Sequence, residues 1–159
     1  MFKNIILNKT IIHKIYMDNI ALSLSIDEIV QELDDKNLLY MTSSKIKEMK
    51  NNILQKLYFN RDELKNYHKK LNDYMFVDEL DEIKLGSYIR WFNITKMDDL
   101  KLYKGGMVID YQQGKDDINI VCKNSRNNVF KLCMNKCVIF KKLSNQEKIL
   151  IKIIDYASN

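Results

Sequence analysis

Residues 83–143 contain short runs of apolar and polar side chains that are separated by turn residues. The first run, Ile83–Ile94, would place Ile89 and Trp91 on one face of a strand and Phe92 on the other. Since neither face is polar, we expect this strand to be covered on both sides. Five further strand-like runs follow, at residues 100–103, 107–111, 118–122, 129–134 and 137–141. Their spacing of roughly ten residues predicts a small antiparallel β-barrel of SH3-like or Tudor-like kind, or a sandwich.

All four glycines of the chain lie in this β part, at positions that suit turns. Gly86 suits a bend at the entrance of the first strand. Gly105 and Gly106 follow Lys104 in a turn, and Gly114 lies in a hairpin loop at 112–117. The stretch 124–128 has no glycine, but its asparagines tolerate the left-handed region.

Helix starts are marked by residues with the chemistry of N-caps. Ser25, Asn60 and Ser144 each precede a Glu three residues later, and Thr42 to Ser44 offer further caps. The predicted helices run from these caps to about residues 33, 58, 73 and 156. The second and third helices carry apolar stripes at Ile46, Met49, Ile53 and Leu57, and at Leu64, Tyr67, Leu71 and Tyr74. We expect Lys45, Lys47, Glu48, Lys50 and Lys56 to face mostly away from the first stripe.

Together these patterns predict an α+β protein with three parts. Residues 1–82 form a mainly helical N-terminal part with an αα-hairpin, in which residues 1–24 could be strands, irregular helices or an arm. Residues 83–143 form the small β-barrel. Residues 144–159 form a C-terminal helix packed on the body.

Composition restricts the class of protein. The chain has 159 residues, of which 46% are hydrophobic, so a buried core is expected. No apolar run approaches the ~20 residues that a membrane span needs, and the N-terminus lacks the features of a signal peptide. Three cysteines, an odd number, favour a reducing compartment.

Charge is uneven along the chain. Residues 1–82 contain 12 Lys and Arg against 14 Asp and Glu, a balance of −2, and residues 83–159 contain 14 against 7, a balance of +7. A positive β part is a footprint that nucleic acid could use. The alternative is a general preference for lysine over other polar residues.

No catalytic or cofactor motif emerges. The Gly105–Gly106 pair belongs to no phosphate-binding motif. Cys122, Cys133 and Cys137 lack the paired spacing and fourth ligand of a zinc site, so burial as small apolar side chains is favoured. We therefore expect no enzyme, no metal and no cofactor, although an unrecognised site stays open.

The strongest candidate for binding combines aromatic and basic residues of the β part. These candidates are Tyr88, Arg90, Trp91, Phe92, Lys104, Lys123, Arg126 and Lys131. Aromatic rings on a sheet can stack on bases while basic side chains hold phosphates. Such residues are also favoured at protein interfaces. In the alternative interpretation, Trp91 and Phe92 form the core of the barrel.

Several segments resemble small, largely uncharacterised proteins of nucleocytoplasmic large DNA viruses. They are ELDEIKLGSYIRWFNI, LKLYKGGMVID, INIVCKN, CVIFKKLSNQEKIL, MTSSKIKEMKNNILQKL and RDELKNYHKKLNDY, within residues 38–155. The resemblance implies a virion component or an accessory factor of the infected cytoplasm. The expected function is a non-enzymatic viral protein that contacts other viral proteins as a minor structural component of the virion. The alternative is a nucleic-acid-binding accessory protein that uses the basic barrel.

Overall fold

A computed structural model describes residues 41–158 of the chain. The described residues divide into two compact units, residues 41–47 with 143–158, and residues 48–142. The predicted helix after Ser25 and the ambiguous stretch 1–24 lie outside the described residues.

Local sequence explains where each helix begins. The α-helices are α3 (Ser43–Gln55), α4 (Arg61–Lys70) and α5 (Asn145–Ala157). At α4, the Asn60 side chain accepts a hydrogen bond from the backbone of Glu63, whose carboxylate accepts one from the Asn60 backbone. Ser144 and Glu147 form the same reciprocal pair at α5. These capping boxes are confirmed as predicted.

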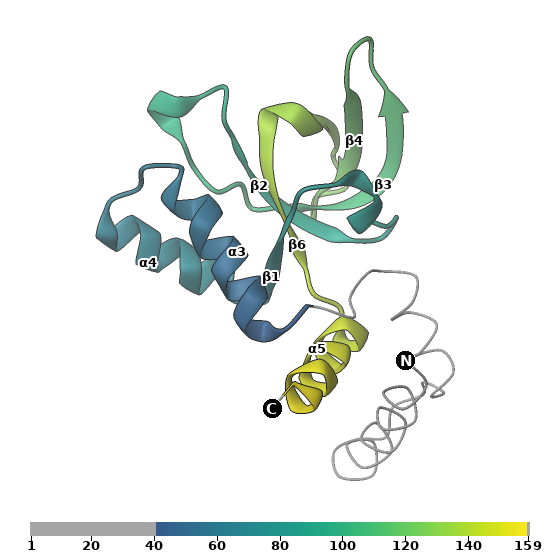
Figure 1. The fold of residues 1–159 in the computed structure, drawn as a ribbon. Coiled ribbons are helices and arrows are strands. Elements are labelled where there is room, and N and C mark those ends of the chain that lie inside the picture. The colour runs from purple at the N-terminus through teal and green to yellow at the C-terminus, as the bar shows by residue number, and fades with distance from the viewer. Residues whose placement is uncertain (1–40, 159) are drawn as a thin grey trace. The chain divides into compact units, whose positions relative to one another are not determined.

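Six antiparallel strands form one sheet (Figure 1). They are β1 (Tyr74–Val77), β2 (Tyr88–Asn93), β3 (Gly106–Gln113), β4 (Ile118–Lys123), β5 (Val129–Cys133) and β6 (Cys137–Lys142). Short 3₁₀ turns lie between them: η2 (Leu80–Glu82), η3 (Met97–Asp99) and η4 (Met134–Lys136). The strand order is β1-β6-β2-β3-β4-β5, so β6 returns to lie between β1 and β2.

The predicted α+β class is confirmed, but the predicted closed barrel is not. Strands β1 and β5 lie at opposite ends of the sheet order and do not pair with each other. Two local predictions were also wrong. Tyr74, predicted on the apolar stripe of a helix that ends at about residue 73, instead begins strand β1. The run Leu100–Tyr103, a predicted strand, forms only an isolated bridge from Leu102 to Phe92.

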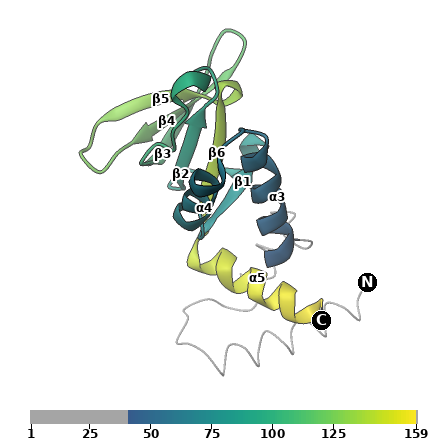
Figure 2. The same cartoon turned by 90° about the vertical axis from the view of Figure 1, so that its left-hand side faces the viewer.

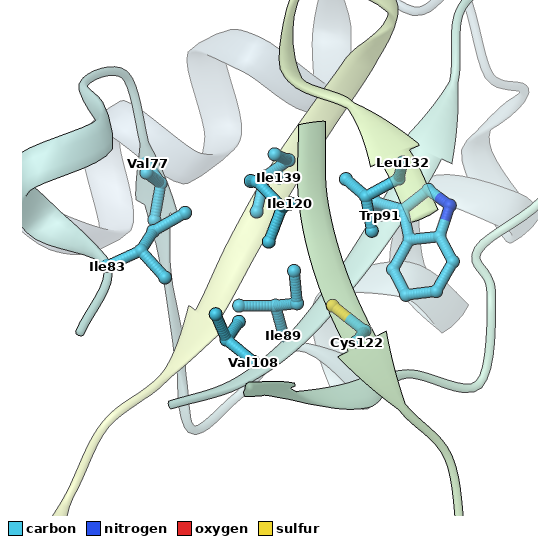
Figure 3. Close-up of a cluster of buried hydrophobic side chains, with 9 residues drawn as sticks. All are labelled: Val77, Ile83, Ile89, Trp91, Val108, Ile120, Cys122, Leu132 and Ile139. Carbon is cyan, nitrogen blue, oxygen red and sulfur yellow. The ribbon is translucent and has the colours of Figure 1, made fainter. Parts of the chain in front are cut away.

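One core lies on the inner face of the bent sheet (Figure 3). Its buried members are Val77, Ile83, Ile89, Trp91, Val108, Ile120, Cys122, Leu132 and Ile139. They come from β1, the loop after η2, and β2 to β6. Burial of an aliphatic or aromatic side chain of this size contributes about 1.5–3 kcal/mol, so this first core stabilises the sheet as a whole.

A second core lies between the sheet and the two helices that precede it. Leu54, Leu57, Leu71, Tyr74, Phe92, Val138 and Phe140 are its buried members. Figure 2 shows α4 and α3 beside the β1–β6–β2 part of the sheet. The Phe92 ring packs against Tyr67 and Phe59, with centroids 5.0 and 5.2 Å away. Strand β2 is therefore covered on both faces, as predicted.

Lys50 was expected on the polar, exposed face of α3, and this prediction is wrong. Its side chain is only 4% exposed. The ammonium donates hydrogen bonds to three backbone carbonyls where α4 ends and β1 begins: Leu71 O at 2.7 Å, Tyr74 O at 3.1 Å and Asn72 O at 3.4 Å. A helix end leaves carbonyls without intrahelical partners, and a lysine can satisfy them.

In the unit that contains residues 143–158, a carboxylate of α5 binds the start of α3. Asp155 accepts hydrogen bonds from the backbone N–H of Ser43 at 2.8 Å and from its hydroxyl at 2.5 Å. The carboxylate thus caps the first turn of α3 from 112 residues away, where a negative charge is favourable.

Candidate interaction surface

Strand β2 sends its two largest aromatic residues into different cores. Trp91 is 7% exposed in the first core, where its ring stacks on Tyr103 at 5.2 Å and 6° and lies 5.3 Å from Phe130. Phe92 is fully buried in the second core. Neither ring offers a face to a partner, so both Trp91 and Phe92 are core residues, as the alternative interpretation predicts.

Arg90 is held by the protein itself. Its Nε donates a hydrogen bond of 2.9 Å to the carbonyl of Tyr103. Its charge also acts on the Tyr74 phenol, whose pKa is raised by burial while Arg90 opposes that rise. The guanidinium is half-buried, which suits a role in joining β2 to the 100–105 segment.

Tyr88 is the one aromatic residue of the predicted cluster that lies on the surface, with 38% of it exposed. Its ring lies across Gly105, where an added Cβ would come within 2.7 Å of ring carbon Cε1 and of the Ile89 carbonyl oxygen. Gly105 also has φ +112°, a value that favours glycine. The phenol donates a hydrogen bond of 3.3 Å to the Lys104 carbonyl. The predicted turn therefore positions Tyr88.

Strand register extends this surface across four strands. Tyr88 pairs with Met107, Met107 pairs with Lys123, and Lys123 pairs with Val129. Directly paired residues of antiparallel strands point to the same face. We call these four residues the outer row, because they lie opposite Ile89, Val108 and Cys122 of the first core. Met107 and Val129 are 43% and 59% exposed.

A β-bulge adds another apolar side chain to this face. Register shifts between Val108 and Asp110, so Ile109 and Asp110 together oppose Val121 of β4. Ile109 is 39% exposed. The bulge also brings Asp110 to this face, as a single carboxylate beside the row.

Four predicted basic residues lie in or beside the outer row. Lys123 belongs to it, and Lys131 lies two positions after Val129 on the same face of β5. Lys104 adjoins Tyr88, and Arg126 lies in the turn between β4 and β5, where its N–H donates to Asn124 Oδ1. Structure thus brings together Tyr88, Lys104, Lys123, Arg126 and Lys131. Sequence reasoning missed Met107, Ile109 and Val129, which only the register could connect.

The three cysteines do not form a metal site in the part of the chain that the structure describes, and no group of three or more His, Cys, Asp and Glu there could hold an ion. Cys122 is buried in the first core, and burial raises its pKa to about 12. Burial likewise raises the pKa of Cys137 to about 12, with the nearby Cys133 and Asp117 adding to the rise. The Cys133 thiol donates to the Asp117 carboxylate, which raises the pKa of the thiol and lowers that of the acid. High pKa values oppose a nucleophilic role.

No helix among residues 41–158 is long and apolar enough to cross a membrane. A scan against models of known protein families finds no match. Searches of curated proteins and of solved structures find no match either. The site must therefore be interpreted from its own geometry.

Proposed function

We propose that this protein acts by protein–protein contact, without catalysis, through the outer row and its flanking residues. The exposed apolar and aromatic side chains on the outer face of β2, β3 and β5 are the observation that carries the proposal. Tyr88 pairs with Met107, and Lys123 separates Met107 from Val129. Tyr88, Met107, Ile109 and Val129 are each more than a third exposed. Apolar side chains gathered on an exposed face are typical of interaction sites, and aromatic residues and Met are enriched in interfaces.

The biological setting is proposed from the sequence resemblance. Segments within residues 38–155 resemble small proteins of nucleocytoplasmic large DNA viruses. The proposed role is a minor structural component of the virion, with other viral proteins as partners and with the virion or the cytoplasm of an infected cell as its location. A surface that binds protein without a catalytic group suits such a component.

Variant-dependent copurification tests this function. The tagged full chain is expressed in infected cells and compared with Met107→Glu/Val129→Glu, which places charge in the outer row. The matched control is Leu85→Glu/Met97→Glu, since these two apolar residues are 61% and 53% exposed outside the row. We expect wild type and control to retain the same viral proteins and to enter purified particles, and the row variant to lose both. Equal retention by the row variant would refute the proposal.

Nucleic-acid binding is the second candidate, because four basic residues lie in or beside the row. Of the predicted aromatic residues, only Tyr88 could stack on a base. Anisotropy titration with single- and double-stranded DNA and RNA at about 50 and 200 mM salt tests it, since phosphate contacts make affinity fall steeply with salt. Lys123→Ala should weaken binding, and Lys115→Ala, in the β3–β4 loop, should not. Absence of binding at low salt would remove this candidate.

A further inference from the structure

The free edge of the sheet continues the outer row. Strand β5 is last in the sheet order and pairs only with β4. Among the described residues, no backbone hydrogen bond joins Val129 to Leu132 to a segment outside that pair. Val129 is also 59% exposed, so nothing in the described structure covers it. An exposed strand edge can accept another strand.

Charge around this edge indicates what that strand would contain. Lys123, Arg126 and Lys131 lie at or beside β5, and Lys104 lies at the other end of the row. Two acidic residues lie near this face: Asp110, next to Val121, and Asp117, whose carboxylate accepts a hydrogen bond from Cys133 of β5. An added segment would therefore meet predominantly positive charge, which acidic side chains complement.

The same charges argue against a second copy of this chain at the edge. Pairing of two β5 strands would bring two sets of Lys123, Arg126 and Lys131 together, and like charges on adjacent strands are destabilising. Lysine on an edge strand also opposes self-association of sheets. A partner with the opposite charge turns this repulsion into attraction.

Resting on the proposed contact function, we infer that the partner presents a short, extended, acidic segment that pairs with the free edge of β5. Its backbone forms hydrogen bonds with β5. Its carboxylates lie on the outer face, where they meet Lys123 and Lys131, and its apolar side chains lie on the opposite face, beside Phe130 and Leu132 of β5. Alternation of acidic and apolar residues follows from the period of two in a strand.

Binding of model peptides to the full chain provides the test. Four ten-residue peptides are compared. Two are unmodified, with alternating Glu and Val or alternating Lys and Val. The other two are Glu–Val peptides with N-methyl groups on alternate backbone nitrogens, along one edge in the first and along the opposite edge in the second. Binding is followed by amide NMR shifts of the isotope-labelled protein, and a single-stranded oligonucleotide is titrated in parallel.

We expect the Glu–Val peptide to bind with Kd below about 1 mM and to shift the amides of Val129–Cys133 most. One N-methyl peptide should lose binding, because it lacks the N–H groups that pair with β5. Lys131→Glu should weaken the Glu–Val peptide at least about tenfold, and the matched control Lys115→Glu should not. Equal binding of the acidic and basic peptides, undiminished binding of both N-methyl peptides, or no peptide binding would overturn the inference. Oligonucleotide binding that alone depends on Lys131 would replace it with a nucleic-acid partner.

Failure here is distinguishable from failure of the proposed function. If copurification depends on Met107 and Val129 but is unchanged in Lys131→Glu, the contact function stands and the acidic segment is refuted. If copurification does not depend on the outer row, both are refuted.

Discussion

Replacement of Lys50 by Met isolates the contribution of its buried ammonium. Methionine keeps most of the aliphatic side chain and removes the three hydrogen bonds to the Leu71, Asn72 and Tyr74 carbonyls. A hydrogen bond to a charged group contributes about 1.5–3 kcal/mol. The bonds to Leu71 and Tyr74 are within ordinary hydrogen-bond length, the bond to Asn72 is long at 3.4 Å, and the desolvation of the ammonium offsets part of the gain. We therefore expect Lys50→Met to lower the free energy of unfolding by about 2–4 kcal/mol.

Urea unfolding followed by fluorescence of the single Trp91 measures this change, because that ring lies in the first core. Lys47→Met is the matched control: Lys47 is exposed on the same helix, and its replacement should change the free energy by less than about 0.5 kcal/mol. If Lys50→Met and the control differ by less than about 0.5 kcal/mol, water can satisfy the three carbonyls, and the proposed stabilisation by the Lys50 ammonium is refuted.

Three other perturbations should change the free energy of unfolding in ways that the structure specifies. Tyr58 is 89% exposed with φ +58°, so Tyr58→Gly should raise the free energy of unfolding by about 1 kcal/mol. Glu48→Gly, at an exposed position inside α3, should lower it by about 1 kcal/mol, and a decrease for both variants in urea denaturation would contradict strain at Tyr58. Burial raises the pKa of Cys122 and of Cys137 to about 12 in the folded protein, whereas an unfolded cysteine has a pKa near 8.5. Their contribution to the free energy of unfolding is therefore fully present below about pH 8.5 and is lost as the pH rises toward 12. Urea titrations should show a decline of at most about 1.4 kcal/mol per pH unit for each thiol, and an undiminished slope in Cys122→Ala/Cys137→Ala would refute their role. Asp155→Ala should cost about 1 kcal/mol and speed amide exchange in the first turn of α3, and unchanged exchange would show that the cap is dispensable.

Local chemistry made the helix starts predictable, whereas the strands depended on distant partners. Asn60 and Ser144 mark helices within four residues, so their caps could be read directly. Strand β1 has four residues, follows a helix closely and exists because it pairs with β6, more than sixty residues later. The burial of Lys50 likewise depends on carbonyls that only the folded α4–β1 connection presents.

The same distinction applies to the candidate surface. Composition identified Tyr88 and the surrounding lysines as candidates for binding. It could not show that Tyr88 is exposed whereas Trp91 and Phe92, on the same strand, are buried. Alternation separates Tyr88 from Trp91, but Tyr88 and Phe92 share a face and differ only because helices cover one end of β2. Met107 and Val129 join the surface through a register that no short stretch of sequence encodes.

Strands β2 and β6 supply buried residues to both cores: Ile89, Trp91 and Ile139 to the first, and Phe92, Val138 and Phe140 to the second. If the packing of either core is lost, one face of β2 and β6 becomes exposed, and the other core loses part of the rigid strands on which it packs. Residues 48–142 should therefore lose their structure in a single cooperative step, with the amides of β2 and β6 exchanging with solvent only through global unfolding. Within residues 41–158, strand β5 pairs with β4 alone, so it can open at lower cost than β2 or β6, which leaves the edge of the sheet adaptable while its centre stays rigid.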